Sequence, residues 1–577
     1  MKYVCIAGIA LSVLVGCQPT PPPAPLNPDR PLTLIGMNDW HGALYETPDP
    51  DNPDWAWGGL PWTVSALEHL RTSLPNPLVV DAGDLFQGSW PINFTKGTGA
   101  LAAFNLLGVD VATVGNHEFD YGAFSDEYPG NRGALEKAAL NPPFEWVTAN
   151  VYERSKQTGE WNPWSPGKIR PWVLLERQGV RVGVIGLSTT ETPTTTRSAF
   201  VDGLEFRDVV DTLREIVPQV REAGAEVIVV TGHLTGSCTP PDYTTEEKGC
   251  VPDGEIGRIL NELPEGTVDV IIAGHEHTLL RQIVGKTVVL EGRHKGHILN
   301  AVTLFVGVDG VVHEKTQLHS PFAVHHPASD PGCEGAAYPE KLQVGGLSLQ
   351  PNPEAIRLIR DLEAQAGSLC EQVACLEAPY PTIRTGPSPL GSLVAQSMSH
   401  AFPEADVAIT NAGEHRASLT ESTVRREHIH DVMPFDNKLL LMEIKGKKLR
   451  QLFEIGTSGA HGMLQIHGAR LTLHANQSKR RDLNGDGNKE VWESSRLCDG
   501  SVQGRPIDPR KTYRIVTTDF LATGGDHLGT AFEEAILLEE GAMLRDAILG
   551  YLRGRTECLP APTNEFPVTE SERCRIR

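Results

Sequence analysis

Imidazole, carboxylate and amide side chains that could bind metal ions follow five apolar runs of this chain. The runs span residues 32–37, 78–81, 109–114, 227–230 and 268–273. The donors that follow them are Asp39 and His41, then Asp84, Asn116 and His233, and finally His275 and His277. Such runs suit strands buried on both faces, and open α/β sheets place binding residues just past their strand ends. The pattern therefore predicts one site at the edge of an α/β domain.

The seven donors have the composition of a site for two metal ions. Two carboxylates, one amide and four imidazoles exceed the three or four protein ligands of a single tetrahedral zinc ion. Mixed nitrogen and oxygen donors fit Zn²⁺, Mn²⁺ or Fe better than Ca²⁺ or Mg²⁺, and we expect zinc or manganese. Two such ions sharing a carboxylate can clamp the attacking and leaving oxygens of an in-line displacement at phosphorus.

The order of these motifs resembles that of the calcineurin-like metallophosphoesterases. The shared patterns are Asp-x-His from Asp39, Gly-Asp-x-x-x-Gly-Ser from Gly83, Gly-Asn-His-Glu-x-Asp from Gly115, Gly-His from Gly232 and Gly-His-x-His from Gly274. The versions around Asn38 and Gly115 are similar to those of the 5′-nucleotidase branch. The resemblance implies a layered αββα sandwich, in which two packed sheets have helices outside.

The resemblance also implies a role for each motif residue. One ion would be held by Asp39, His41, Asp84 and His277, and the other by Asp84, Asn116, His233 and His275. His117 is not a ligand in that family; it stabilises charge on the transferred phosphoryl group, and Asp120 orients it, as in other carboxylate–histidine pairs.

A second set of motifs resembles the C-terminal domain of 5′-nucleotidases. In the Asn-x-Gly-x-x-Arg pattern, Asn411 and Arg416 are the residues implied to contact substrate. Phe435 follows a Pro, and Phe520 begins a Phe-Leu-Ala-x-Gly-Gly-Asp loop; the family implies that the two rings sandwich the base. A planar base gains about 1–3 kcal/mol from such stacking. Asp526, which ends that loop, would hold the ribose hydroxyls.

Some positions depart from the family pattern. Gly386 stands where the family usually has a phosphate-binding arginine, so Arg384, two residues earlier, is our candidate for that role. Glu414 and His415 replace small or apolar residues beside the other presumed phosphate arginine. These changes leave the metal chemistry intact and leave the particular substrate open.

A separate stretch fits the calcium-loop pattern D-x-[DN]-x-[DN]-G-x5-E. Its candidate oxygen ligands are Asp482, Asn484, Asp486, Asn488 and Glu493. The flanking residues do not resemble paired EF-hand helices. A structural Ca²⁺ ion remote from catalysis and a polar loop that binds no ion are the two interpretations.

The start of the chain has the pattern of an exported bacterial lipoprotein. Residues 1–16 have a basic start and a short apolar core, which predict a signal peptide. The Leu-Val-Gly-Cys ending resembles a lipobox, so we expect lipidation at Cys17 and, since Gln18 follows, anchoring to the outer membrane. A proline-rich tether follows over residues 17–31.

The rest of the 577-residue chain is long enough for two domains. We divide it into a metallophosphoesterase domain (32–345), a linker (346–375) and a second, α/β or α+β, nucleotide-binding domain (376–577). Apolar residues at helical spacing predict a linker helix over 354–363, capped by Asn352.

Eight cysteines follow Cys17, and an even number in an exported chain favours disulfides. The local pairs we consider are Cys238–Cys250, Cys370–Cys375 and Cys558–Cys574. Connectivity cannot be read from sequence, and oligomeric state is equally open.

The formal net charge of −22 argues against nucleic acid as an electrostatic partner. The leading hypothesis is a lipid-anchored enzyme that hydrolyses nucleoside 5′-monophosphates. A UDP-sugar or dinucleotide pyrophosphatase and a 2′,3′-cyclic-nucleotide phosphodiesterase are alternatives on the same scaffold. A nucleotide-binding lipoprotein without catalysis is the alternative of another class.

Overall fold

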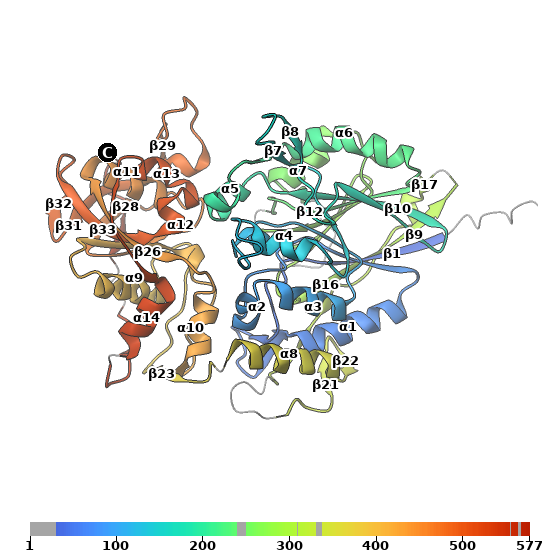
Figure 1. The fold of residues 1–577 in the computed structure, drawn as a ribbon, viewed down its shortest axis with the longest axis horizontal. Helices are drawn as coiled ribbons and strands as arrows, with labels where there is room; N and C mark the ends of the chain where they lie inside the picture. Colours follow the sequence, from blue (N-terminus) through green and yellow to red (C-terminus); the bar gives the residue numbers. More distant parts are fainter. Residues whose placement is uncertain are drawn as a thin grey trace, which may run out of the picture.

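A computed structural model shows two domains side by side (Figure 1). It describes residues 30–238, 250–308, 310–329, 337–367, 369–553, 555–563 and 567–576. The signal peptide, nearly all of the tether and Cys17 lie outside these ranges, so export and lipidation stay predictions. Within the described ranges, no helix combines the length and apolar character needed to cross a bilayer.

The first domain is an αββα sandwich, which confirms the predicted fold class. One sheet has the strand order β17-β16-β1-β4-β5-β6, and β18 and β19 also pair with β16. Its strands are β1 (Arg30–Met37), β4 (Pro77–Asp81), β5 (Val111–Thr113), β6 (Glu145–Val147), β16 (Ile298–Gly307), β17 (Gly310–Val311), β18 (Gln317–Leu318) and β19 (Phe322–Ala323). The other sheet has the order β14-β15-β13-β12-β10-β9. Its strands are β9 (Trp172–Arg177), β10 (Val180–Ser188), β12 (Val227–His233), β13 (Val270–Gly274), β14 (Leu279–Val284) and β15 (Thr287–Gly292).

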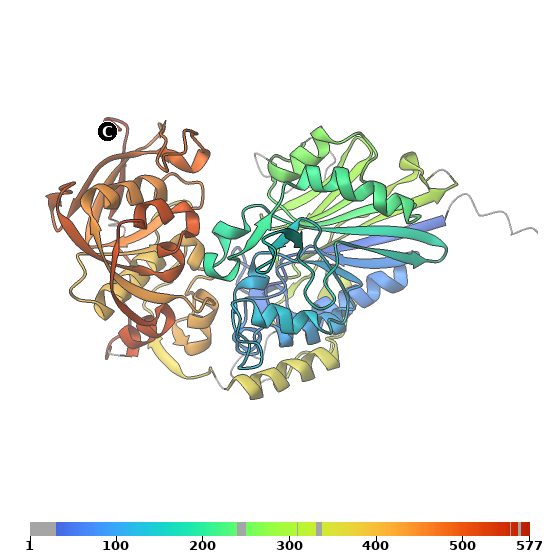
Figure 2. The ribbon, with the colours of Figure 1, turned by 45° about the horizontal axis from the view of Figure 1, so that its top comes forward.

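Apolar side chains from both sheets fill the space between them. Leu34, Val80 and Val229 are fully buried in this layer. Strands β1, β4 and β5 run parallel, as do β10, β12 and β13, so their carboxyl ends gather at one edge of each sheet. Helices cover both outer faces (Figure 2): α1 (Leu60–Ser73), α3 (Thr98–Leu107) and α4 (Gly133–Ala139) on one side, and α6 (Val209–Glu222) and α7 (Gly254–Glu262) on the other.

The predicted linker helix is α8 (Pro353–Ala366). The Asn352 side chain accepts hydrogen bonds from the backbone N–H groups of Glu354 and Ala355, both at 3.0 Å, which confirms the predicted cap. Its apolar face, including Ile359, packs into the core of the first domain beside α1 and α3. The helix therefore belongs to the first domain in packing, and the chain crosses to the second domain after it (Figure 2).

The second domain is built on a mixed sheet with the order β27-β24-β33-β26-β34. Its strands are β24 (Val407–Asn411), β26 (Lys438–Lys445), β27 (Leu464–His467), β33 (Thr512–Thr518) and β34 (Ile536–Met543). Helices α9 (Pro389–Ala401), α10 (Arg426–Val432) and α14 (Leu544–Arg553) cover one face, and α11 (Gly446–Gly456) covers the other. A smaller sheet joins β28 (Ala469–His474), β31 (Leu497–Val502), β32 (Arg505–Pro506) and β35 (Val568–Ser571).

The disulfides confirm one predicted pair and contradict two. Cys238 is bonded to Cys250, as expected. Cys375 is bonded to Cys558 and Cys498 to Cys574, so the predicted pairs Cys370–Cys375 and Cys558–Cys574 are wrong. Strand pairing explains the error. Residues 376 and 559 form a β-bridge, while the strand of Cys498 and the strand before Cys574 both pair with β28.

We expect the Cys375–Cys558 bond to stabilise the second domain strongly, because it joins residues 183 positions apart. By the chain-entropy relation, replacing both cysteines with alanine should lower the free energy of unfolding by about 5 kcal/mol. The matched control is the Cys238/Cys250 double alanine variant, whose cysteines are 12 positions apart and whose expected loss is about 3 kcal/mol. Denaturant titration under oxidising conditions measures both, and a larger loss in the control would contradict the expectation.

Candidate functional site

The seven predicted donors lie together at the strand ends of the first domain. Asp39 and His41 follow β1, Asp84 follows β4 and Asn116 follows β5; His233 ends β12, and His275 and His277 follow β13. The loops are tied to one another as well as to their strands. The backbone N–H of His275, for example, donates to the Asp39 carboxylate at 3.0 Å.

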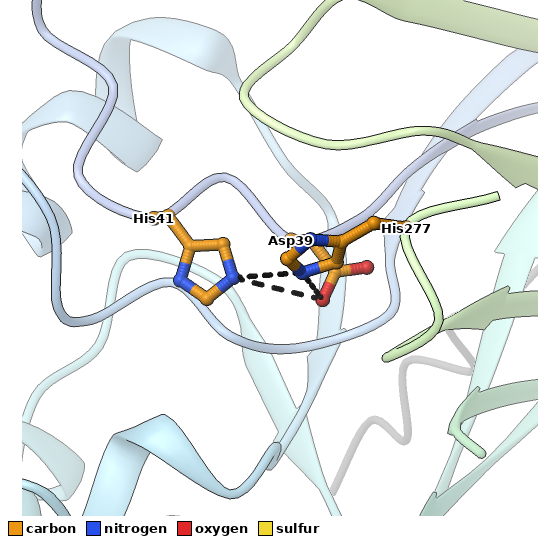
Figure 3. Close-up of side chains that lie close together, drawn as sticks. All are labelled: Asp39, His41 and His277. Carbon is orange, nitrogen blue, oxygen red and sulfur yellow. Dashed lines mark hydrogen bonds and ion pairs between the residues drawn. The ribbon is translucent and has the colours of Figure 1, made fainter. Parts of the chain in front are cut away.

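One group of donors consists of Asp39, His41 and His277 (Figure 3). The Nε2 atoms of His41 and His277 are 3.1 Å apart. The Oδ1 atom of Asp39 is 3.3 Å from Nε2 of His277 and 3.9 Å from Nε2 of His41. Three potential ligand atoms from two loops thus point toward one position.

A second group surrounds the imidazole of His233. Its Nε2 atom lies 3.1 Å from Oδ2 of Asp84, 3.0 Å from Oδ1 of Asn116 and 3.2 Å from Nδ1 of His275. The same Oδ2 atom of Asp84 is 3.7 Å from Nε2 of His41, in the first group. Asp84 therefore stands between the two groups, where a bridging carboxylate would stand.

The donor set fits divalent transition-metal ions. The carboxylates of Asp39 and Asp84 are at most 2% exposed. Imidazole nitrogens lie close to both, that of His277 to Asp39 and that of His233 to Asp84. Burial holds the pKa values of His41 and His277 well below the ordinary value, so both imidazoles are in the neutral form that ligates metals. His233 differs, because burial alone would lower its pKa, but the carboxylates of Asp84 and Asp39 raise it to about 10; a metal ion bound there would displace that proton. Buried carboxylates, an amide oxygen and imidazoles at this spacing match a mixed nitrogen and oxygen coordination shell.

Glu118 holds two of these loops in place, a role that sequence reasoning did not assign. Its carboxylate accepts backbone hydrogen bonds from Asp84 (3.0 Å), Leu85 (2.7 Å), Phe86 (3.1 Å) and Gly115 (2.6 Å). Glu118 is part of the Gly-Asn-His-Glu-x-Asp motif, so the sequence marks its position. Its role could not be predicted, because its partners are backbone N–H groups, which any residue type provides.

Five of the seven donors have left-handed backbone conformations. Their φ angles are 48° for Asp39, 45° for His41, 57° for Asp84, 94° for His275 and 57° for His277. For residues other than glycine these angles are uncommon, and each costs free energy that the surrounding structure must supply. Such strain concentrates at functional sites, where it aims side chains that regular backbone would direct elsewhere.

His117 lies beside the donors and is paired with Asp120. Its Nδ1 atom is 2.5 Å from Oδ2 of Asp120, whose other oxygen accepts from the Thr196 hydroxyl at 2.9 Å. Burial alone would lower the pKa of His117, but the carboxylates of Asp120 and Asp84 outweigh it and raise that pKa. These two carboxylates therefore favour the protonated form of His117.

A cavity of about 700 Å³ separates the two domains and contains both halves of the predicted site. From the first domain it is lined by Asp84, Asn116, His117, Asp120, His275 and His277. From the second it is lined by Arg384, Asn411, Arg416, Phe435, Phe520 and Asp526. Asp39, His41 and His233 lie behind its wall. An Arg416 nitrogen approaches Nε2 of His117 to 3.5 Å, so the second domain reaches the donor loops.

The turn that carries Phe435 is held from both domains. Arg545, in the second domain, donates to the carbonyls of Met433 (3.0 Å) and Phe435 (3.3 Å). From the first domain, Asn93 donates to the Pro434 carbonyl at 2.8 Å, and Arg197 donates to the Asp436 carbonyl. None of these three supporting side chains lies in a motif, so no pattern in the sequence signals them.

The candidate calcium loop uses most of its oxygen atoms internally. The Asp482 carboxylate accepts from the backbone of Gly485 and Gly487, and Asp486 accepts from Asn488. Glu493 accepts from three backbone N–H groups of the same loop. Calcium binding stays a prediction. The loop is not remote from the site, because its Trp492 lines the cavity.

A layered αββα domain with buried nitrogen and oxygen donors at its strand ends defines the class of metal-dependent phosphoesterases. Residues 32–279 match the family model described as calcineurin-like phosphoesterase, and residues 372–534 match the one described as 5′-nucleotidase, C-terminal domain. The chain belongs to the 5′-nucleotidase family, which combines these two domains.

Individual relatives are distant. A probable 5′-nucleotidase from Treponema pallidum is 26% identical over 95% of both chains, and endonuclease YhcR from Bacillus subtilis is 25% identical over 85% of this chain. The chain spans between 33% and 65% of the length of the first three curated relatives that it matches. The structure of a 5′-nucleotidase precursor from Thermus thermophilus shares the fold, with a TM-score of 0.72 at 22% identity over 94% of this chain and 99% of that one.

Glu414, one of the departures from the family pattern, is a buried carboxyl group on the cavity wall. It is 3% exposed, and its Oε1 atom accepts from the Asn437 side chain at 2.7 Å. Burial, opposed in part by this hydrogen bond, raises the pKa of Glu414 to about 8. The native protein therefore holds a proton at neutral pH that the unfolded chain, with a glutamate pKa of about 4.3, releases.

We expect Glu414→Gln to make the protein less sensitive to rising pH. Between about pH 4.3 and 8 the native state keeps this proton and the unfolded state does not, so Glu414 lowers stability by up to about 1.4 kcal/mol per pH unit. The glutamine side chain has nearly the shape of the protonated glutamate and does not titrate. Its free energy of unfolding relative to wild type should rise from pH 5 to pH 8, as measured by denaturant titration. Parallel curves for the two proteins would contradict the assigned protonation.

Proposed function

We propose that this protein is a two-metal phosphohydrolase that converts nucleoside 5′-monophosphates to nucleoside and phosphate. One observation carries the proposal: Arg416 of the second domain lies 3.5 Å from His117 and 5.6 Å from the ring centroid of Phe435. A phosphate-binding cation, the metal donors and an aromatic ring thus share one cavity. That combination suits a phosphate ester whose other end is a planar base.

The chain's own residues would divide the work as follows. Arg416 and Arg384 bind the phosphate oxygens, since a guanidinium can donate two parallel hydrogen bonds. Phe435 and Phe520 bind the base. His117, whose pKa is raised by Asp120 and Asp84 and whose ring is oriented by Asp120, donates to a phosphoryl oxygen as negative charge develops in the transition state.

Asn411 and Asp526 both line the cavity. They form a pair there, because the Asn411 amide donates to the Asp526 carboxylate at 2.8 Å. We assign them to the ribose hydroxyls.

We propose that two divalent ions are held by Asp39, His41, Asp84 and His277 and by Asp84, Asn116, His233 and His275. When bound, they would supply Lewis-acid stabilisation of the attacking and leaving oxygens. Buried Asp84 belongs to both groups, so its replacement should affect both ions together.

We also propose that the protein is exported and anchored to the outer membrane by a lipid on Cys17. The disulfides of the described residues support an oxidising compartment outside the cytoplasm. Relatives named as a cell wall protein of Listeria monocytogenes and as snake venom 5′-nucleotidases support export.

Hydrolysis of five compounds, followed by chromatography of the products, tests the nucleotide assignment, because cleavage of UDP-glucose or cyclic 2′,3′-AMP does not itself release phosphate. Protein loaded with Mn²⁺ or Zn²⁺ should prefer AMP and UMP over UDP-glucose, cyclic 2′,3′-AMP and p-nitrophenyl phosphate. Phe520→Ala should lower kcat/KM for AMP by roughly 5- to 150-fold, with a smaller loss for p-nitrophenyl phosphate. The matched control is Phe322→Ala, outside the cavity lining. Turnover of p-nitrophenyl phosphate alone would keep the phosphatase and reject the nucleotide substrate.

His117→Ala separates catalysis from metal binding. The Nε2 atom of His117 is 3.9 Å from Oδ2 of Asp84, close enough for a ligand role to need testing. We expect turnover to fall by roughly 10²- to 10⁴-fold while the metal content of the protein stays at the wild-type level. Elemental analysis and phosphate release on the same sample measure both, with exposed His400→Ala as control. Joint loss of metal and activity would make His117 a ligand.

A further inference from the structure

Glu414 lies where the two segments that carry the proposed base-binding phenylalanines meet. Its side chain is hydrogen-bonded to Asn437, two residues after Phe435. The segment that carries the second ring joins at the same place, because the backbone N–H of Lys438 donates to the Asp519 carboxylate at 3.0 Å. Glu414 lines the cavity together with both phenylalanines. A polar group in this position faces the edge of a base that lies between the two rings.

A chain of hydrogen bonds fixes how the carboxyl group of Glu414 is used. The Nε and Nη2 atoms of Arg197 donate to Oδ1 of Asn437 at 3.2 and 3.1 Å. A guanidinium has no acceptor atom, so Asn437 must turn its oxygen toward Arg197 and its amide nitrogen toward Glu414. That nitrogen donates to Oε1 of Glu414 at 2.7 Å. The carbonyl oxygen of a carboxylic acid is its better acceptor, so a proton on this group belongs on the other oxygen, Oε2.

The Oε2 atom of Glu414 is left for the cavity. Within the described ranges no group is hydrogen-bonded to it, although the residue is only 3% exposed. Burial raises the pKa of Glu414 to about 8, so the carboxyl group is protonated at neutral pH. The Asn437 hydrogen bond and the Arg197 cation oppose this rise in pKa. The carboxylates of Asp519 and Asp526 add to it. The cavity wall therefore presents one oriented O–H donor.

A donor at the edge of the base can distinguish bases that stacking cannot, because every base has a π-face. Adenine and cytosine present an unprotonated ring nitrogen beside an amino group, whereas hypoxanthine and uracil present a ring N–H beside a carbonyl. The unprotonated ring nitrogen is a more basic acceptor than a carbonyl oxygen, so it forms the stronger hydrogen bond with a carboxylic O–H. The neighbouring amino group can donate to the free lone pair of Oε1 of Glu414.

We infer that Glu414 is a specificity-determining residue that recognises the edge of the base by donating from Oε2 to a ring nitrogen, so that the site prefers nucleotides with amino-substituted bases. The inference rests on the proposed function, because it takes the substrate to be a nucleoside monophosphate whose base lies between Phe435 and Phe520. It narrows the substrate class to adenine and cytosine nucleotides.

AMP and IMP are a matched pair of probes, because their bases have the same size and opposite donor and acceptor patterns at one edge. With the Mn²⁺-loaded protein we expect kcat/KM for AMP to exceed that for IMP by roughly 5- to 150-fold, since the ring N–H of IMP leaves the buried O–H of Glu414 without an acceptor. CMP should exceed UMP in the same sense. A ratio is used because losses from misfolding or poor metal loading affect both substrates equally.

Two substitutions separate the hydrogen bond from the shape of the side chain. Glu414→Gln should keep the preference for AMP, because its amide can accept from Asn437 and still donate toward the base. Glu414→Met has a similar length and no polar group at its end, so it should bring the ratio of AMP to IMP close to one. The matched control is Glu421→Met, an exposed glutamate of the same domain outside the cavity lining, which should keep the wild-type ratio.

The same measurements separate this inference from the proposed function. Hydrolysis of monophosphates with equal use of AMP and IMP, or with a preference for IMP, would overturn the role of Glu414 alone. So would a preference for AMP that survives in Glu414→Met, or one that Glu414→Gln loses as fully as Glu414→Met does.

Absence of hydrolysis of every monophosphate would overturn the proposed function. Calorimetric titration with adenosine and inosine then decides the role of Glu414. Tighter binding of adenosine that is lost in Glu414→Met supports it. Equal binding of the two nucleosides, or a difference that Glu414→Met leaves unchanged, overturns it.

Discussion

The hydrogen bonds of one buried carboxylate, that of Glu118, set the geometry on which the candidate site depends. Four backbone N–H groups from two loops converge on it, and Glu118 itself is 1% exposed. Each of these donors would otherwise be buried without a partner, at a cost of about 1–3 kcal/mol. The arrangement fixes Asp84 against the loop of Asn116 and His117. With Asp84 in that position, its Oδ2 atom lies near both groups of candidate metal donors. Arg416 from the other domain approaches His117 in the same loops.

The sequence predicts the strands, helices and motif residues of this fold better than the contacts between segments far apart in the chain. Continuous apolar runs predict the buried strands, and the motifs after them predict the donors, because parallel strands bring their carboxyl ends to one edge whatever lies between them. Asn352 and Pro353 likewise predict the start of α8 from local chemistry. The errors arise where strand order decides proximity. Cys375 meets Cys558 through a β-bridge that joins distant parts of the chain. The supporting role of Arg197 was not predicted for the same reason, since its partners lie about 240 positions away.

Both domains position the ring of Phe435, for which we propose a base-binding role. The turn of Phe435 receives hydrogen bonds from Asn93 and Arg197 on one side and from Arg545 on the other. The position of this ring is therefore coupled to the approach of the domains, and the same approach brings Arg416 to His117. The position of Phe435 and the approach of Arg416 to His117 are thus consequences of a single arrangement. The backbone joins the domains through the short segment from α8 to β23 (Gln372–Cys375), so side-chain contacts carry most of this coupling.

The Cys375–Cys558 bond turns most of the second domain into a covalently closed ring. A backbone cut by a protease anywhere between these two residues opens the ring and releases no fragment, because the disulfide still joins the two pieces. The piece before the cut stays attached to the linker through the backbone and the piece after it through the disulfide, and the noncovalent core can hold both in place. The protein could thus be nicked in its second domain and still keep every residue of the cavity.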